Sequence, residues 1–177
     1  MGKFTRILIA DDDSDILASY KEALEGANHK VTTTHDGMEC LEVYYREYQK
    51  VQSERVDLGI TSPFDVVVLD YKMPKKNGLE AAKEIISLNP SQRIIFASAY
   101  IQDTVMDSVK VLGKILEVIK KPFPLSELVD QIENKEIFSE LEKLNVNINN
   151  LKDIEPTHHS LKIYLGALTM LQKHKTN

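Results

Sequence analysis

Apolar runs alternate with amphipathic segments from the start of the chain to about residue 140. Val, Ile, Leu and Phe dominate most of the runs, which predicts strands, and the segments between them carry apolar residues at helical spacing. The expected strands are residues 4–10, 30–34, 65–70, 93–97 and 115–119. The expected helices are residues 14–26, 36–52, 78–88 and 102–112, with a fifth beginning near residue 124. The pattern is a β-α unit repeated five times.

This alternation predicts a parallel sheet with helices on both faces, because right-handed crossovers place the helices there. The expected fold class is therefore α/β, with a doubly wound, five-stranded parallel sheet. Central strands of such a sheet are buried on both faces and should be almost wholly apolar, as the first, third and fourth runs are. The second run, residues 30–34, is polar and is expected at an edge of the sheet.

Helix boundaries are marked by residues that cap or break helices. Ser14 is the expected N-cap of the first helix, and Gly26 lies near its expected end. Asn89 and Pro90 are expected to end the third helix, since proline cannot continue one. Ser126 is the expected cap of the fifth helix. The apolar stripe of that helix consists of Leu125, Leu128, Val129 and Ile132.

Two stretches are longer than five such units require. Residues 44–63 have a strongly polar centre, which predicts an extended second helix followed by an exposed loop. After residue 143, an asparagine-rich run is typical of a linker. We therefore expect a domain of residues 1–140 and a linker with a helical extension over residues 141–177, too short for a standard effector domain. The stripe that predicts this additional C-terminal helix consists of Leu161, Tyr164, Leu165, Leu168 and Leu171.

Composition narrows the function classes. The hydrophobic share of 42% and the charged share of 28% are typical of a soluble globular protein. A net charge of -5 gives no overall basic footprint, so no nucleic-acid partner is expected. Cys40 is the single cysteine, which excludes an intrachain disulfide and fits the cytoplasm. No apolar stretch approaches the roughly 18 to 20 residues that span a bilayer, so membrane insertion is not expected.

Chemically active side chains follow four of the expected strands. Asp11 and Asp12 come after the first, Asp70 ends the third, Ser98 follows the fourth, and Lys121 follows the fifth. Taken singly, these residues are typical of exposed turns, helix caps and solvated loop cations. Because the carboxyl ends of parallel strands meet at one edge of an open sheet, we expect them to lie together.

Three carboxylates at one sheet edge predict a bound cation. A pair of like charges about 4 Å apart repels by roughly 1 kcal/mol in water and about 4 kcal/mol at an effective dielectric of 20. Mg²⁺ would relieve this repulsion, and it keeps water ligands that a phosphate can replace. Such an ion could bridge Asp70 to a phosphoryl group. Asp13, next in the acidic run, is expected to be solvated beside the helix cap.

These residues resemble the receiver domain of two-component response regulators. The likeness covers about residues 4–135 and rests on four segments in the family's order and spacing. The segments are Ile9-Ala10-Asp11-Asp12, Asp70-Tyr71-Lys72-Met73-Pro74 through Gly78, Ser98-Ala99 and Lys121-Pro122-Phe123. The resemblance implies a flavodoxin-like receiver fold.

The resemblance also implies roles for individual residues. Asp70 would be the phosphoacceptor. Ser98 and Lys121 would contact the phosphoryl oxygens, and the Lys121-Pro122 peptide bond would be cis. The implied ligands of Mg²⁺ are Asp11, Asp12, Asp70 and the backbone carbonyl of Lys72.

As a response regulator, the chain would receive a phosphoryl group from a sensor histidine kinase or a histidine phosphotransfer protein. It would hydrolyse its own aspartyl phosphate slowly and would not act as a turnover enzyme. Its output would be contact with an unidentified downstream protein, with no DNA-binding domain, through the face of the fourth helix, fifth strand and fifth helix. A homodimer through that face or through the C-terminal helix stays open as an alternative.

One residue departs from the family pattern. Val118 stands where the family usually carries an aromatic switch residue, so the way in which phosphorylation changes the output face stays an open question.

Two other functions are alternatives. A Mg²⁺-dependent phosphohydrolase of the haloacid dehalogenase family would need Asp where Lys72 stands. A degenerate receiver, used only for docking, would not need the complete acidic pocket. Tyr100, close to Ser98, is expected to slow hydrolysis of the aspartyl phosphate.

Overall fold

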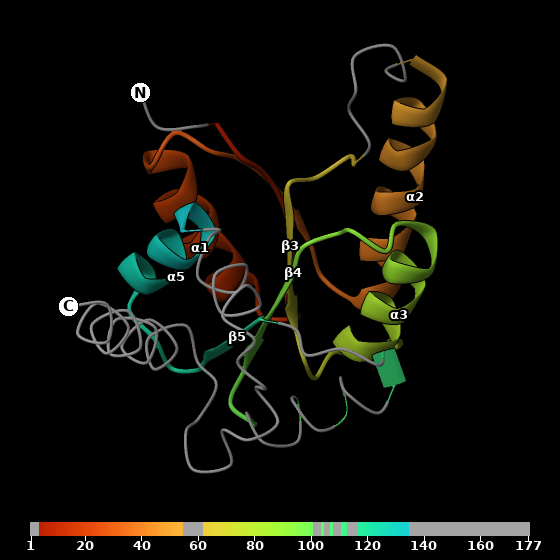
Figure 1. The fold of residues 1–177 in the computed structure, drawn as a ribbon. Helices are drawn as coiled ribbons and strands as arrows, with labels where there is room; N and C mark the ends of the chain where they lie inside the picture. The colour runs from red at the N-terminus through yellow and green to blue at the C-terminus, as the bar shows by residue number, and fades with distance from the viewer. Residues whose placement is uncertain are drawn as a thin grey trace, which may run out of the picture.

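A five-stranded parallel sheet organises the part of the chain that the computed structural model describes, namely residues 4–54, 62–100, 104, 107, 111–112 and 117–134. Figure 1 shows the sheet edge-on between two layers of helices. The elements are β1 (Arg6–Ala10), α1 (Ser14–Gly26), β2 (Lys30–Thr34), α2 (Gly37–Glu54), β3 (Val66–Asp70), α3 (Gly78–Leu88), β4 (Ile94–Ser98), β5 (Glu117–Lys120) and α5 (Leu125–Glu133).

The strand order is β2-β1-β3-β4-β5, and every neighbouring pair is parallel. After β1 the chain adds β2 on one side and then crosses to the other side for β3, so the order reverses between β1 and β3. The carboxyl end of the sheet at such a reversal is where ligands bind in open α/β folds. The doubly wound α/β prediction is confirmed, and polar β2 does lie at an edge.

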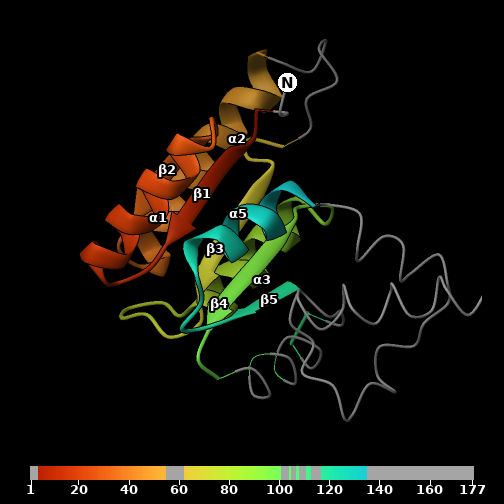
Figure 2. The ribbon, with the colours of Figure 1, turned by 90° about the vertical axis from the view of Figure 1, so that its left-hand side faces the viewer.

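Alternate residues of the central strands enter two separate apolar cores. Leu8, Leu69 and Phe96 pack with α2 and α3, whereas Ile9, Val68 and Ile119 pack with α1 and α5. The two views agree that α1 and α5 share one face of the sheet (Figures 1 and 2). Burial of both faces explains why the middle strands are almost wholly apolar. None of the helices in the described residues is long and apolar enough to cross a membrane.

Two predicted helix caps are wrong. Asp13, not Ser14, caps α1, because its side chain accepts hydrogen bonds from the backbone N–H groups of Asp15 and Ile16 at 2.9 and 3.1 Å. A carboxylate also complements the positive end of the helix dipole, which a hydroxyl does not. At α5 the N-cap is Pro124, with no side-chain cap, so Ser126 has no capping role.

The removal of the Asp13 cap should be measurable as lost stability. We expect Asp13→Ala to lower the free energy of unfolding by about 1 kcal/mol, since two backbone donors lose their acceptor. Ser14→Ala should change it by less than about half of that, because Ser14 is exposed and does not cap. Urea unfolding of the two variants checks this, and an equal loss in both would contradict the cap assignment.

The other predicted elements match the structure closely where it describes them. α2 runs on to Glu54, two residues beyond the predicted end at residue 52, and β5 is shifted towards Lys121. The expected helix over residues 102–112 is described only at Thr104, Asp107, Val111 and Leu112. The expected loop is described only at its ends, and the C-terminal helix lies outside the described residues.

The start of α3 is pressed against the backbone of Asp70. A Cβ at Gly78 would lie 2.2 Å from the carbonyl oxygen of Asp70, so only glycine fits there without a shift. Asn77 and Glu80 form a reciprocal capping box that fixes where the helix begins. Gly78 N–H also donates to the Tyr71 carbonyl at 3.2 Å. The turn that follows Asp70 is therefore fixed by α3.

Candidate functional site

Three strands bring Asp11, Asp70 and Lys121 together at the carboxyl end of the sheet. The Lys121 ammonium lies 2.6 Å from Asp11 Oδ2 and 2.6 Å from Asp70 Oδ1. The Lys121 N–H also donates to the Ser98 carbonyl at 2.9 Å, and the Lys121-Pro122 bond is cis, as predicted. Four segments that are distant in sequence thus converge as expected.

Each carboxylate is oriented by its own turn. Asp11 is buried, and its Oδ1 accepts from Asp13 N–H at 3.1 Å. Asp70 is partly buried, and its Oδ2 accepts from Lys72 N–H at 2.9 Å. One oxygen of each group is therefore held by the backbone, and the other faces the Lys121 ammonium.

Burial and charge act in opposite directions on Asp70. Burial raises the pKa of Asp70 above its usual value of 3.8, the hydrogen bond and charge of Lys121 lower it, and the Asp11 charge raises it again. Burial by itself would lower the pKa of Lys121, but the hydrogen bonds to Asp11 and Asp70 outweigh it and the pKa is raised. The raised pKa of Lys121 therefore favours its charged form between the two carboxyl groups.

The shift of Asp70 predicts a titration that depends on Lys121. Carboxyl-carbon NMR should find the pKa of Asp70 above 3.8, and Lys121→Met should raise it further by removing the partner that favours the carboxylate. A raised pKa means that the folded state favours the neutral acid, so this contribution to stability is present below pH 3.8 and is lost as the pH rises through the folded pKa. A lower pKa in Lys121→Met than in the wild type would contradict this account.

Ser98 is buried at the end of β4 and is hydrogen-bonded within its own loop. Its Oγ accepts from Tyr100 N–H at 2.9 Å and lies 3.0 Å from Thr104 Oγ1. Thr104 Oγ1 is also 2.6 Å from the Tyr100 carbonyl. The hydrogen bonds recorded for Ser98 among the described residues do not reach Asp70. The hydroxyl lies at the predicted strand end, linked to the segment that follows β4.

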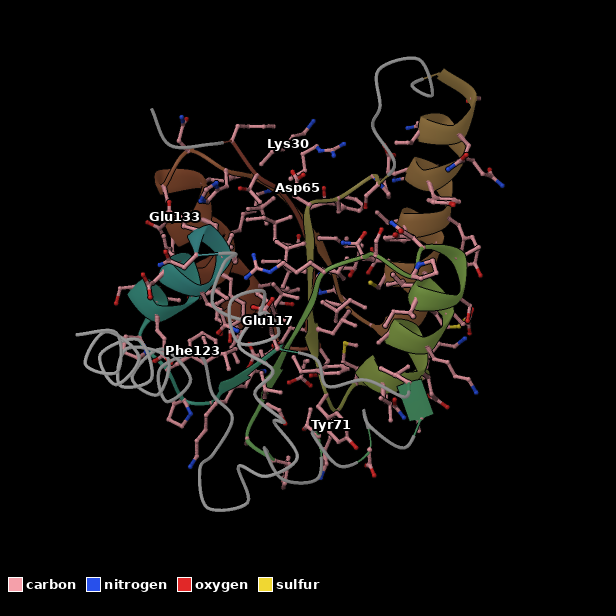
Figure 3. The ribbon with its side chains drawn as sticks, viewed as in Figure 1. Lys30, Asp65, Tyr71, Glu117, Phe123 and Glu133 are labelled. Carbon is pink, nitrogen blue, oxygen red and sulfur yellow. The ribbon has the colours of Figure 1, made fainter. Side chains whose placement is uncertain are left out.

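Two tyrosines, Tyr71 and Tyr100, make contacts next to the site. From the sequence, only Tyr100 was expected to have a role there. Tyr71 donates its hydroxyl to Asp107, and its ring packs edge-on against Phe96 with the centroids 6.1 Å apart. Lys72 Nζ lies 3.6 Å from the centroid of the Tyr100 ring, in cation–π geometry. Figure 3 shows Tyr71 at the carboxyl end of the sheet. These contacts join the two residues that follow Asp70 to β4 and to the segment after it.

Aromatic packing also fixes the turn after Lys121. The rings of Tyr20 and Phe123 stack with centroids 5.5 Å apart, which holds this turn against α1. Burial, followed by the charges of Asp11 and Asp70, raises the pKa of the Tyr20 hydroxyl well above its ordinary value. Tyr20 therefore stays neutral and packs against Phe123, two residues after Lys121.

The residue types at this edge fit a hard divalent cation. Asp11, Asp12 and Asp70 carry three negative charges against the one positive charge of Lys121, and their oxygens are ligands that Mg²⁺ prefers. The Lys121 ammonium already occupies a cation position between two of the carboxylates. In the described part of the chain, no three His, Cys, Asp or Glu side chains are grouped to hold a metal ion. Asp12 is exposed, so a metal would have to draw it in and displace the ammonium.

Comparison with known proteins identifies relatives of this domain. The family model described as the response regulator receiver domain matches residues 7–133. The chain is similar to the chemotaxis protein CheY of Thermotoga maritima, with 31% identity over 134 residues that cover 75% of this chain and 96% of that protein.

Solved structures agree on the fold. The crystal structure of a response regulator receiver domain protein from Clostridium thermocellum has a TM-score of 0.60 at 25% identity, covering 78% of this chain and 98% of that one. The receiver domain of a sensor histidine kinase from Pseudomonas aeruginosa, solved with a magnesium ion in its active-site cleft, has a TM-score of 0.58 at 19% identity. It covers 73% of this chain and 95% of that one.

Proposed function

The chain belongs to the response regulator receiver domain family, and from this premise we propose that Asp70 accepts a phosphoryl group from a phosphohistidine on a sensor histidine kinase or a histidine phosphotransfer protein. One observation carries the proposal: Lys121 lies within 2.6 Å of both Asp11 and Asp70, at the sheet edge where the strand order reverses. This arrangement sets an ionised nucleophile beside a fixed positive charge.

In the proposed reaction, a carboxylate oxygen of Asp70 attacks phosphorus, the P–N bond to the imidazole breaks, and an acyl phosphate forms. The imidazole leaves with the electron pair of that bond and takes up a proton. The Lys121 ammonium moves from the Asp70 carboxylate to a phosphoryl oxygen, where it stabilises developing negative charge. The turn after β3 keeps the attacking oxygen in place because Lys72 N–H holds the other one.

The proposal includes a Mg²⁺ ion bound beside Asp70. Asp11, Asp12, Asp70 and the carbonyl of Lys72 are the groups that would hold Mg²⁺, and the excess of negative charge at the site supports this. When bound, Mg²⁺ neutralises charge on the transferring phosphoryl oxygens. Mg²⁺ would compete with the Lys121 ammonium for the space between the Asp11 and Asp70 carboxylates.

Ser98 is proposed to donate its hydroxyl to a phosphoryl oxygen. Because the same oxygen accepts from Tyr100 N–H and lies beside Thr104, that donation would alter the contacts of the segment after β4. Val118 is buried among the apolar residues on the α2 and α3 side and offers no ring to rotate. We therefore propose that the signal passes through Thr104 and through the Tyr71 hydrogen bond to Asp107.

The remaining parts of the proposal concern context. Residues 1–140 would form the receiver and residues 141–177 a linker with a helical extension. The protein would work in the cytoplasm, without a DNA-binding output domain. Its output would be a downstream protein partner or a homodimer, through the face of the fourth helix, fifth strand and fifth helix or through the C-terminal helix. In this account, phosphorylation changes the affinity of a surface and the protein is not a turnover enzyme.

The proposal is tested by labelling the full chain with acetyl phosphate and Mg²⁺ and following the intact mass. We expect one phosphoryl group per chain in the wild type and in Asp65→Asn, a control just before the opposite end of the same strand, and none in Asp70→Asn. The adduct should be removed by hydroxylamine, as an acyl phosphate is. Labelling that persists in Asp70→Asn would overturn the assignment, and turnover of many phosphate esters per chain would favour the phosphohydrolase.

The contact between Lys72 and Tyr100 leads us to expect slow hydrolysis of the aspartyl phosphate. Tyr100 is 49% exposed, and its ring lies against Lys72, two residues after Asp70. We expect Tyr100→Ala to shorten the lifetime of the aspartyl phosphate severalfold, with Tyr45→Ala, an exposed tyrosine on α2, as the control. Loss of phosphate followed by intact mass measures this, and an unchanged lifetime in Tyr100→Ala would reject the hypothesis.

A further inference from the structure

A second concave site lies at the opposite end of the sheet from Asp70. It is a groove between the C-terminal half of α2 and the start of β1 and β2, with a volume of about 240 Å³. Figure 3 shows Lys30 and Asp65 at this end of the molecule, away from Tyr71. The α2 residues from Val43 to Val51 form one wall of the groove, and the beginnings of β1 and β2 form the other.

The walls of this groove are basic. Arg6 and Lys30 come from the strands, and Arg46 and Lys50 come from α2. Among the described residues, Glu47 is the one acidic residue that lines the groove, and it lies 3.3 Å from Arg46 and 2.8 Å from Lys50. With Asp65, which lies 3.4 Å from Arg6, the count is four positive and two negative charges. This is a net charge of +2 on a chain whose total is -5.

The described carboxylates do not fully neutralise the cations of the groove. Lys30 is exposed, and no carboxylate among the residues that the structure describes lies within ion-pair distance of its ammonium. Arg46 and Lys50 share a single carboxylate. Arg6 also donates to the Ser62 carbonyl at 3.0 Å, which fixes its guanidinium at the edge of the groove. Positive charges on two facing walls leave room for an anion between them.

We propose that this groove binds a small organic phosphate. Guanidinium groups match phosphate oxygens in a forked geometry, and ammonium groups add point charge. Apolar side chains, including Val43 and Phe64, line the same space and suit the organic part of such a ligand. The groove volume of about 240 Å³ lies below the roughly 300 to 1,000 Å³ of most ligand pockets, so we expect a ligand at the small end of that class.

Binding at this groove is independent of the phosphoacceptor proposal. The groove residues come from α2 and from the N-terminal side of the sheet, and among the described residues no hydrogen bond or ion pair joins them to Asp70, Asp11 or Lys121. We therefore expect Asp70→Asn to bind the ligand as the wild type does. The groove proposal and the phosphoacceptor proposal are therefore tested by separate measurements, and either one can fail while the other holds.

The test is a titration of the full chain with AMP, pyrophosphate and citrate, followed by NMR of backbone amides at low salt. We expect AMP and pyrophosphate to shift the amides of Lys30, Thr32 and Arg46, and citrate to bind more weakly. Tighter binding of AMP than of pyrophosphate supports a role for the apolar lining, and the reverse order overturns the organic part of the proposal. Equal or tighter binding of citrate overturns the phosphate part, and no shift with any probe overturns both.

Charge variants make the test specific to the groove. Lys30→Gln with Arg46→Gln should weaken AMP binding at least tenfold, whereas Glu47→Gln should tighten it, by up to about fivefold for the single surface charge removed. Lys83→Gln, an exposed lysine on α3, is the control and should leave the affinity unchanged. Circular dichroism checks that all variants fold. The same affinity in the double variant and in Lys83→Gln would overturn the proposal.

Discussion

Replacement of Lys121 by methionine should slow phosphorylation of Asp70 by about a hundredfold and, at the same time, tighten the binding of Mg²⁺. The phosphoryl oxygens lose the charge that stabilises them, and in enzymes the loss of one such donor costs about 10² to 10³ in rate. The ammonium that lies between Asp11 and Asp70 also disappears, so the two carboxylates repel each other and attract a cation more strongly.

The opposite signs of these two effects make the Lys121 experiment informative. Labelling rates with acetyl phosphate measure the first effect, and calorimetric titration with Mg²⁺ measures the second. Lys83→Met, on the exposed side of α3, should change neither. Weaker Mg²⁺ binding in Lys121→Met would indicate a collapsed site and contradict a competition between ammonium and metal.

Substitution of Gly78 by alanine should be among the most destabilising single changes in the described part of the chain. The new methyl group would lie 2.2 Å from the Asp70 carbonyl oxygen and 3.4 Å from Leu69 Cβ, so β3 and α3 must move apart. Overpacking of this kind costs about 1 to 3 kcal/mol or more. We expect a loss of about 3 kcal/mol in the free energy of unfolding, together with slower phosphorylation, because the backbone that shifts is that of Asp70.

Gly26 provides a matched control for this prediction. It ends α1, and a Cβ there would meet nothing within 4 Å. Gly26→Ala should therefore leave stability unchanged or raise it by up to about 1 kcal/mol, through helix propensity and a less flexible unfolded chain. Urea unfolding of both variants measures the difference. Similar stabilities for Gly78→Ala and Gly26→Ala would contradict the close packing of α3 on Asp70.

The parts of the fold that the sequence predicted well are those governed by burial. Apolar β1, β3 and β4 and polar β2 are distinguishable because burial on two faces excludes polar side chains, and this placed β2 at the edge. The convergence of Asp11, Asp70 and Lys121 could be predicted because the carboxyl ends of parallel strands all lie at the same edge of the sheet.

The parts that the sequence did not reveal depend on local competition or on tertiary neighbours. Asp13 and Ser14 are both good N-caps, and only the backbone geometry decides between them. Two features join segments that are far apart in the sequence and share no periodic pattern: the contact of Tyr71 with Asp107 and the groove beside Lys30. Residue spacing alone therefore could not predict either of them. Ser98 was expected to direct its hydroxyl towards the phosphoryl group, but among the described residues the hydrogen bonds of this hydroxyl are with the segment that follows β4.

The most direct test of the central claim is a crystal structure of the full chain with Mg²⁺ and beryllofluoride, a phosphoryl mimic. The account predicts beryllium bonded to an Asp70 oxygen, Mg²⁺ held by Asp11, Asp12 and Asp70, and the Lys121 ammonium moved from the carboxylates to a fluorine. Beryllofluoride absent from Asp70, or Lys121 still bridging Asp11 and Asp70 beside the bound mimic, would contradict it.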